Sequence, residues 1–198
     1  MNYIDTVKQL GYPADTIKGY AVNEIPDHIP HALATYYHQV GKMAFNMAHN
    51  ELYPPKALTQ QDQRWVFMHE NQSVAYWAFD CNSTEPDPLV LQYLSCENGY
   101  EWHPETQLQE FLTRMMYFQT SMGGFPYCGT SDNHSLLLQL QQQWNVTPYN
   151  FDGMSFIVQK GIVVLAFDAK ELDIFVSAYY ESKLEEFENT FQLQLEHL

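Results

Sequence analysis

The 198-residue sequence predicts an α+β protein, a single domain over residues 1–198 in which a mainly antiparallel sheet packs with several amphipathic helices. Three observations lead to this class. Short runs rich in aromatic and β-branched residues recur at 65–79 and 154–179. Segments with apolar residues at helical spacing lie before, between and after these runs. Because strands and helices form separate groups along the chain, the order does not suit a doubly wound parallel sheet.

Four helices are predicted from apolar residues that recur at helical spacing. The first lies at 25–41, where Asp27 is a plausible cap and Gly41 the end. The other three lie at 104–118, at 131–144 and from 181 onward. The residues expected to face the core are Ile29, Leu33, Tyr36, Tyr37 and Val40, then Leu108, Phe111, Leu112, Met115 and Tyr117 or Phe118, and last Leu184, Phe187, Phe191 and Leu195.

Six strands are predicted from short apolar runs bounded by turn residues. They lie at 65–68, 74–79 and 89–94 in the first half, and at 154–159, 161–167 and 173–179 in the second. The first two flank a short polar turn at 70–73 and therefore predict a hairpin. The last three are separated by turns at 160–161 and 168–172, which predicts three antiparallel strands.

Composition and cysteine usage suit a soluble protein of the cytoplasm. Hydrophobic residues make up 45% of the chain, enough for a substantial core. The three cysteines, Cys81, Cys96 and Cys128, form no CxxC pair and predict reduced thiols. The first ten residues lack the basic and apolar regions of a signal peptide, and no run of about 18 apolar residues predicts a membrane span.

The charge of the chain is strongly negative. With 24 Asp and Glu against 9 Lys and Arg, the formal net charge is −15, which should repel nucleic acid and anionic membranes. Between Arg64 and Lys160 the only basic residue is Arg114. Two interpretations stay open at this point: a solvated surface that keeps the protein soluble, or a field that steers a partner.

The sequence offers little for catalysis or metal binding. His28, His31 and His38 project within an arc of about 80° on a helix, yet the outer two lie about 15 Å apart, too far for one metal ion to bridge. No nucleophile elbow occurs, and no phosphate-binding Lys follows Gly123 and Gly124. We therefore expect no cofactor, no metal and no enzymatic activity. An enzyme ranks third among the candidate functions, behind the two binding functions given below.

Several short motifs occur in a fixed order in the middle of the chain. They are FMHENQSVAYWAFD, DPLV, YEWHPE and LQEFL, which include Glu70, Asn71, Gln72, Trp77, Asp87, Pro88 and Trp102. Together with the helix at 25–41, this order resembles the SUKH superfamily, which includes bacterial toxin-immunity proteins and fungal regulators of cell-wall assembly. Two positions depart from the family pattern: Ser73 stands where the family usually has Gly, and Leu89 where it often has a second Pro.

The motif residues have a structural and a functional interpretation. Turn side chains such as Glu70 can accept backbone N–H groups, and a strand Trp is more often core than contact. Alternatively, the motif lines a groove for a partner. In either case the resemblance implies an immunity protein that binds and neutralises a cognate toxin, often one that acts on nucleic acid and is therefore basic.

Candidate contacts for that partner combine aromatic and acidic residues, because aromatic side chains within a polar rim are typical of binding hot spots. They are Tyr93, Glu97, Tyr100, Glu101 and Glu105, whereas Trp102 is expected in the core. The alternative function is a housekeeping adaptor or scaffold that binds a resident protein with the same fold. The oligomeric state cannot be predicted from these patterns.

Overall fold

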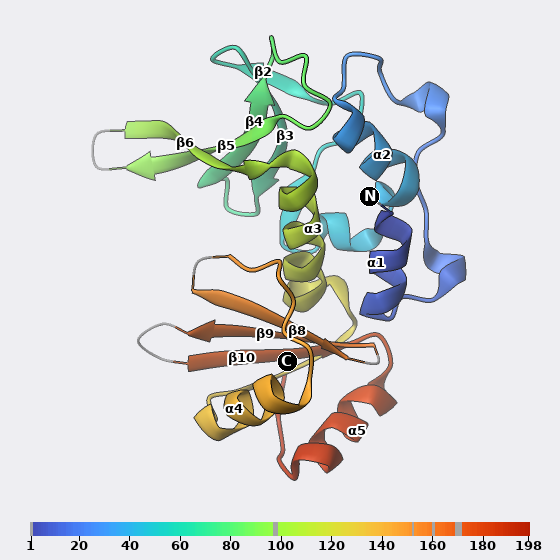
Figure 1. Cartoon of the computed structure of the whole chain (residues 1–198), viewed down its shortest axis with the longest axis vertical. Helices are drawn as coiled ribbons and strands as arrows, with labels where there is room; N and C mark the ends of the chain where they lie inside the picture. The colour runs from blue at the N-terminus through green and yellow to red at the C-terminus, as the bar shows by residue number, and fades with distance from the viewer. Residues whose placement is uncertain (1, 97–98, 152, 160, 169–171) are drawn as a thin grey trace. The chain divides into compact units, whose positions relative to one another are not determined.

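The computed structural model describes residues 2–96, 99–151, 153–159, 161–168 and 172–198 (Figure 1). Helices and antiparallel strands confirm the α+β class. Contacts between residues group the chain into two compact units, 17–113 on the one hand and 2–16 with 114–198 on the other. The expectation of one domain over the whole chain stays a prediction.

The first unit contains an antiparallel sheet with the strand order β1-β3-β4-β5-β6, in which β2 also pairs with β3. Its strands are β1 (Asn50–Leu52), β2 (Thr59–Gln61), β3 (Arg64–Glu70), β4 (Ala75–Asp80), β5 (Leu89–Cys96) and β6 (Gly99–Gln107). The predicted hairpin is therefore confirmed as β3 and β4, and the predicted strand at 89–94 as β5. The alternation of side chains along these strands gives the sheet two different faces.

One face of this sheet is buried against the start of α3 (Leu108–Gln119), a helix whose residues from 114 onward belong to the second unit. The ring of Phe111 lies 5.8 Å from that of Phe67 and 5.7 Å from that of Trp77. All three side chains are at most 5% exposed. Aromatic pairs at this distance stabilise a core beyond their buried area. Trp77 is thus a core residue, as expected.

Helix α2 (His31–Val40) forms later in the chain than predicted. Its N-cap is Pro30, and Asp27 makes no cap. Proline disfavours the helical conformation of the residue before it, so Pro30 keeps Ile29 out of the helix. The helix buries the predicted side of its surface and ends at Gly41 as expected. Ile29 is buried as well, although it precedes the helix.

The helix predicted at 104–118 is partly wrong. Residues 104–107 belong to β6, which pairs with β5, and α3 begins only at Leu108. The backbone N–H groups at the start of α3 donate hydrogen bonds to residues of an earlier segment of the chain. Asp87 accepts a hydrogen bond from the N–H of Gln109 at 2.7 Å, and the carbonyl of Pro88 accepts one from Leu108 at 2.9 Å. A cap that comes from another segment leaves no local sign in the sequence.

The second unit contains an antiparallel sheet with the order β11-β7-β10-β9-β8. Its strands are β7 (Tyr127–Ser131), β8 (Met154–Gln159), β9 (Ile162–Asp168), β10 (Leu172–Ala178) and β11 (Glu196–His197). Its helices are α1 (Tyr3–Leu10), α4 (His134–Gln143) and α5 (Glu181–Phe191), besides the end of α3 and the short turn helix η4 (Thr120–Gly124). A core cluster joins α4 and α5 to the sheet through Leu140, Ile157, Val164, Val176 and Phe187, each at most 1% exposed.

Most of this unit follows the sequence expectations. The three predicted strands are β8, β9 and β10, and the predicted helices at 131–144 and from 181 are α4 and α5. Helix α5 ends at Phe191 because Gln192 adopts a left-handed conformation, so Leu195 is buried outside the helix. Helix α1 and strands β7 and β11 were not predicted.

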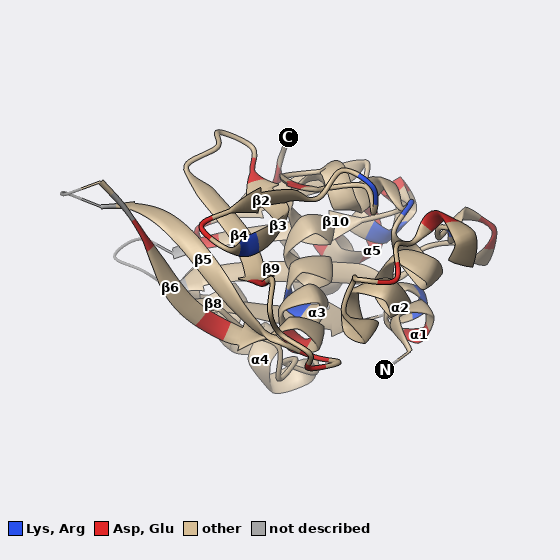
Figure 2. Ribbon diagram, turned by 90° about the horizontal axis from the view of Figure 1, so that it is seen from above, with Lys and Arg blue, Asp and Glu red and all other residues tan. Residues whose placement is uncertain are grey.

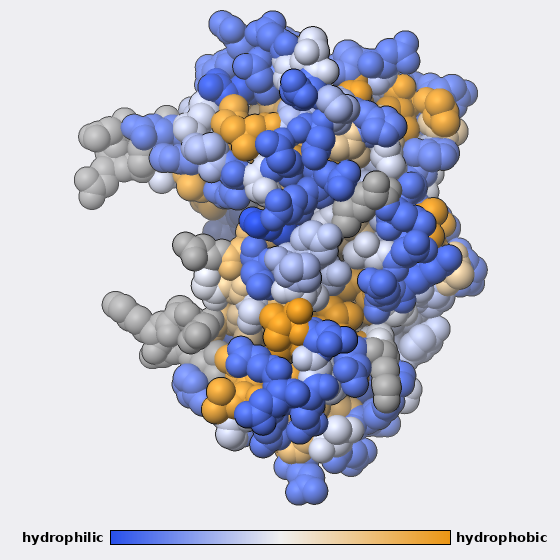
Figure 3. Space-filling model, viewed as in Figure 1, coloured by the Kyte–Doolittle hydropathy of each residue, from blue (hydrophilic) through white to orange (hydrophobic). Residues whose placement is uncertain are grey.

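Hydrophilic residues cover most of the face in Figure 3, and apolar residues form small separate patches on it.

Candidate functional site

Four side chains form a row across the open face of the first unit's sheet, the face opposite Phe67 and Trp77. His69, Tyr76, Tyr93 and Trp102 are successive cross-strand partners on β3, β4, β5 and β6. Their ring centroids lie 6.3, 6.3 and 4.7 Å apart along the row. All four side chains are half-buried. Cross-strand aromatic pairs of this kind stabilise a sheet and hold one another in place. We call these four residues the aromatic row.

The row continues at the β1 side with Glu51 and Tyr53. Glu51 is the cross-strand partner of His69, and its Oε2 lies 3.5 Å from Nε2 of that histidine. The ring of Tyr53 lies 5.2 Å from the ring of His69. Partial burial raises the pKa of Tyr53, and Tyr76 and Glu51 add to this increase. The phenol therefore stays protonated and can donate a hydrogen bond at neutral pH.

At the β6 end, Trp102 is held by Asp62, in the turn between β2 and β3, and by Arg64, the first residue of β3. Its Nε1 donates a hydrogen bond to Oδ2 of Asp62 at 3.2 Å. The guanidinium of Arg64 lies 4.8 Å from the centre of the indole ring, a cation–π geometry. Arg64 Nη1 also donates to the carbonyl of Asp62 at 2.7 Å. The expectation that Trp102 is a core residue is wrong, because β-strand alternation places it on the open face.

The other motif residues are mostly engaged within the fold. Oε2 of Glu70 accepts the N–H of Gln72 at 2.7 Å and that of Val74 at 3.5 Å, which closes the β3–β4 turn. Ser73 completes this turn with a φ of 59°, a left-handed conformation that favours Gly. Asn71 is exposed at its tip. These contacts, with the cap formed by Asp87 and Pro88, support the fold-maintenance interpretation of the motif.

The predicted partner contacts are only partly brought together. Tyr93 is the cross-strand neighbour of Trp102, as described above. Glu101 is exposed but points to the opposite face, because successive residues of a strand alternate. Glu105 lies further along β6 and is half-buried. Glu97 and the side chain of Tyr100 lie outside the described residues.

Sequence reasoning missed His69, Tyr76, Asp62 and Arg64 as members of this site. Tyr76 precedes the motif Trp by one residue, so a strand there places it on the face that Trp77 avoids. That signal was available from the sequence. The contact of Asp62 and Arg64 with Trp102 depends on the pairing of four strands and had no sequence signal.

An acidic groove of about 440 Å³ lies in the same unit, lined by the last residues of β4 and β6 and the first residue of β5. Asp80, Glu85 and Asp87 line it together with the apolar residues Leu89 and Leu91. None of the three carboxylates forms an ion pair with a cation in the described residues. Figure 2 shows how few Lys and Arg positions accompany the Asp and Glu positions along the ribbon, and β6 carries acidic positions without a basic one. The site therefore combines aromatic side chains with uncompensated negative charge.

Neither a metal centre nor an activated thiol is found among the residues that the structure describes. No group of three or more His, Cys, Asp or Glu side chains there is placed to hold a metal ion. His28 instead stacks on Trp65, with ring centroids 4.8 Å apart. Burial raises the pKa of the Cys81 and Cys128 thiols, and Asp80 adds to the effect at Cys81. A raised pKa lowers the fraction of reactive thiolate.

Comparisons with known proteins give no match: no family model, no curated protein and no solved structure is similar to this chain. Among the helices of the described residues, none has the length and apolar content needed to span a membrane. The fold and the site together define an α+β protein whose first unit carries an aromatic row on an open sheet face.

Proposed function

We propose that this chain binds a basic protein through the aromatic row of its first unit. The observation that carries the proposal is the contiguous alignment of His69, Tyr76, Tyr93 and Trp102 on an open sheet face. Tyr and Trp are enriched at binding hot spots, where they supply large contact areas. Their positions on paired strands, with Trp102 held by Asp62 and Arg64, lower the entropy lost on binding.

The basic character of the partner follows from charge complementarity. The net charge is −15, and the acidic groove at the same sheet lacks ion pairs in the described residues. Such a field attracts a positively charged surface and accelerates association, to about 10⁸ M⁻¹s⁻¹ or more at low salt. The SUKH-like motif order supports a narrower proposal: the partner is a toxin that acts on nucleic acid, and this chain neutralises it in the cytoplasm.

A pull-down tests both levels of this proposal. The tagged full chain is used as bait at low and at high salt, and bound proteins are identified by mass spectrometry. We expect a basic partner whose association rate falls as salt rises. If that partner is toxic when expressed alone, co-expression of this chain should restore growth. Recovery of neutral or acidic resident proteins alone would contradict the basic-partner proposal and favour the adaptor.

The face itself is tested by substitution. Tyr93→Ala with Trp102→Ala should weaken binding of the recovered partner by about 30-fold or more, since the loss of even one hot-spot side chain costs about 2 kcal/mol. The matched control is Tyr180→Ala, which removes a tyrosine that is 53% exposed in the second unit and should leave affinity unchanged. Equal affinity of the double variant and the wild type, with both folded, would exclude the aromatic row as the binding face.

A further inference from the structure

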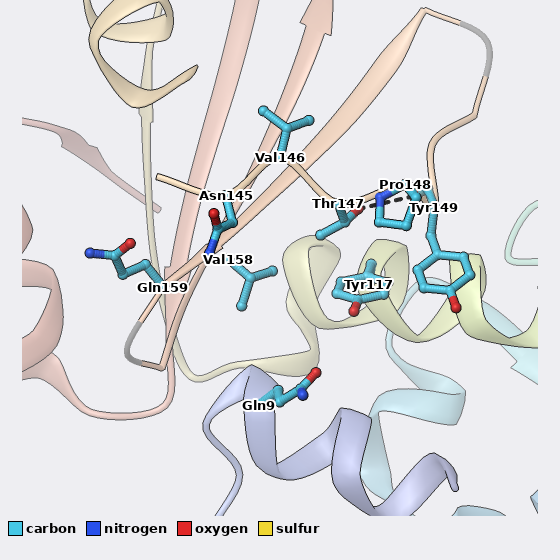
Figure 4. Close-up of a pocket in the computed structure, with 9 residues that line it drawn as sticks. All are labelled: Gln9, Tyr117, Asn145, Val146, Thr147, Pro148, Tyr149, Val158 and Gln159. Atoms are coloured by element: carbon cyan, nitrogen blue, oxygen red, sulfur yellow. Dashed lines mark hydrogen bonds between the residues drawn. The ribbon is translucent and has the colours of Figure 1, made fainter. Parts of the chain in front are cut away.

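The second unit contains a cavity of about 520 Å³ that is separate from the aromatic row (Figure 4). Its walls come from α1, from α3, from the segment 145–149 and from β8. The volume falls within the range of about 300–1,000 Å³ that is usual for small-molecule sites. The size of the cavity therefore suits a small ligand better than a protein side chain.

The wall formed by 145–149 is fixed to the edge of the sheet by backbone hydrogen bonds. The N–H of Thr147 donates to the carbonyl of Phe156 at 2.9 Å, and that of Val158 donates to the carbonyl of Asn145 at 3.4 Å. Val146 and Ile157 form a β-bridge between these two contacts. A wall held in this way is already formed before a ligand binds, which lowers the entropy cost of binding.

Among the described residues that line the cavity, none carries a charge, although the chain carries a net charge of −15. Two of its polar side chains are primary amides, those of Gln9 and Asn145, and they come from different segments (Figure 4). Gln159 follows Val158 on β8, so its side chain lies on the opposite face of the strand, where it lines another pocket together with Phe187. Neither the Gln9 nor the Asn145 amide forms a hydrogen bond with another of the described residues. Each amide offers two donor hydrogens and one acceptor oxygen. The described lining residues therefore present unused donors and acceptors and no net charge.

Two tyrosines line the same cavity. The rings of Tyr117 and Tyr149 are stacked, with centroids 5.9 Å apart and an interplanar angle of 20°. Tyr117 also packs on Phe156 at 5.8 Å and is only 6% exposed. Burial raises the pKa of Tyr117, with a further contribution from Tyr149, so its hydroxyl remains protonated. Because Tyr117 already contacts a ring on each of two sides, it offers no open slot for a planar base.

From these features we propose that the cavity binds an uncharged, hydroxyl-rich small molecule of the size of a mono- or disaccharide. A hydroxyl group both donates and accepts, which matches the amides of Gln9 and Asn145. An ionic ligand would lose its hydration without gaining a counter-charge, and an apolar ligand would bury the amides unpaired. The apolar side chains of Pro148 and Val158 suit the C–H face of a sugar ring. This site is independent of the aromatic row.

Nuclear magnetic resonance on the full ¹⁵N-labelled chain tests the proposal. The neutral probes are glucose, N-acetylglucosamine and maltose at about 10 mM, a concentration that detects dissociation constants near 1 mM. Glucuronate and glucosamine carry the same ring with one negative or one positive charge, and adenosine supplies a planar base. We expect at least one neutral sugar to shift the side-chain amide signals of Gln9 and Asn145, and to bind about tenfold more tightly than its charged analogue.

Variants separate a specific site from general surface effects. Gln9→Ala with Asn145→Ala removes two exposed amides and should weaken sugar binding about tenfold or more, at about 1 kcal/mol for each lost hydrogen bond. Gln141→Ala removes an exposed amide of α4 outside the cavity and should change nothing. The proposal is overturned if no neutral sugar binds, if charged analogues or adenosine bind as well, or if the double variant binds like the wild type.

Discussion

Trp102 and Asp62 are joined by a hydrogen bond across the sheet, although 40 residues separate them in the sequence. The indole Nε1 lies 3.2 Å from Oδ2 of Asp62, and Arg64, at the start of β3, covers the ring of Trp102. Asp62 holds a positive φ of 49°, which turns the chain between β2 and β3. The turn thus fixes the orientation of the largest side chain of the aromatic row.

Asp62→Ala should release the Trp102 indole without unfolding the chain. An exposed hydrogen bond to a carboxylate contributes about 1 kcal/mol, so we expect a small loss of stability and an upfield shift of the Trp102 indole N–H resonance. Asp62→Asn keeps an oxygen acceptor and is the matched control, with a smaller shift. An indole resonance that is the same in both variants and in the wild type would contradict the role of Asp62.

Charge and shape should affect different rate constants for the proposed partner. Glu85→Gln with Glu101→Gln removes two acids that lie outside the aromatic row, so we expect a lower association rate and an unchanged dissociation rate. Trp102→Ala should instead raise the dissociation rate, because it removes buried contact area. Surface plasmon resonance at two salt concentrations measures both constants. A glutamate effect confined to dissociation would show that these acids lie within the interface.

Ser73→Gly should stabilise the first unit. Ser73 has a φ of 59°, and the left-handed conformation costs a residue with a Cβ about 1 kcal/mol relative to Gly. We therefore expect the free energy of unfolding to rise by about 1 kcal/mol in urea denaturation. The control is Gln72→Gly at the neighbouring exposed position, which has no positive φ and should lose stability. A destabilised Ser73→Gly variant would show that the hydroxyl matters more than the backbone conformation.

How far the fold could be predicted depends on where its determinants lie. The strands at 154–178 and the helix from 181 carry their own periodicity, and local patterns were sufficient there. Helix α1 was missed although Asn2 caps it and Gly11 ends it, because a helix of 8 residues offers few positions at which a helical period can show. The start of α3 could not be predicted, since Asp87 supplies its cap from another segment.

The site was less predictable than the fold for a physical reason. Tyr93 was identified from its aromatic character among acidic residues, and its partner Trp102 was assigned to the core. Which residues share a sheet face depends on strand register, and a shift of one residue would exchange the two faces. Only the observed pairing of Tyr76 with Tyr93 and of Tyr93 with Trp102 defines the aromatic row.

Tyr12→Phe should change how stability depends on alkaline pH. Burial raises the pKa of Tyr12 far above its ordinary value of 10.0, so the folded state holds its proton where the unfolded state loses it. The stabilisation that the protonated Tyr12 side chain gives to the folded state is fully present below pH 10, and it is lost as pH rises through and beyond that value. Tyr37 behaves in the same way.

At neutral pH the Tyr12 variant should be less stable by about 1 kcal/mol, because the hydroxyl donates to the carbonyl of Gly124 at 3.1 Å and contacts Oγ1 of Thr120 at 3.3 Å. Between about pH 8 and about pH 11 this difference should shrink or reverse, as measured by urea unfolding. Tyr127→Phe, at an exposed tyrosine, is the control and should show a constant difference. A pH-independent difference for Tyr12→Phe would contradict the role of its ionisation.

Gly11→Ala should be the most destabilising of these substitutions. Gly11 ends α1 with a φ of +109°, its N–H bonds to the carbonyl of Lys8, and a Cβ placed on it would lie 2.5 Å from the Cα of Gly161. Two costs therefore add: the strained backbone, about 1 kcal/mol, and a clash between two backbones that cannot be relieved by a rotamer change.

Gly153→Ala isolates the first cost, because Gly153 also has a positive φ, +72°, with open space around it. We expect a loss of about 1 kcal/mol for Gly153→Ala and about 3 kcal/mol or more for Gly11→Ala in urea unfolding. Similar losses for the two variants would mean that α1 moves freely away from the β8–β9 turn, and that the wall which Gln9 contributes to the cavity is not fixed.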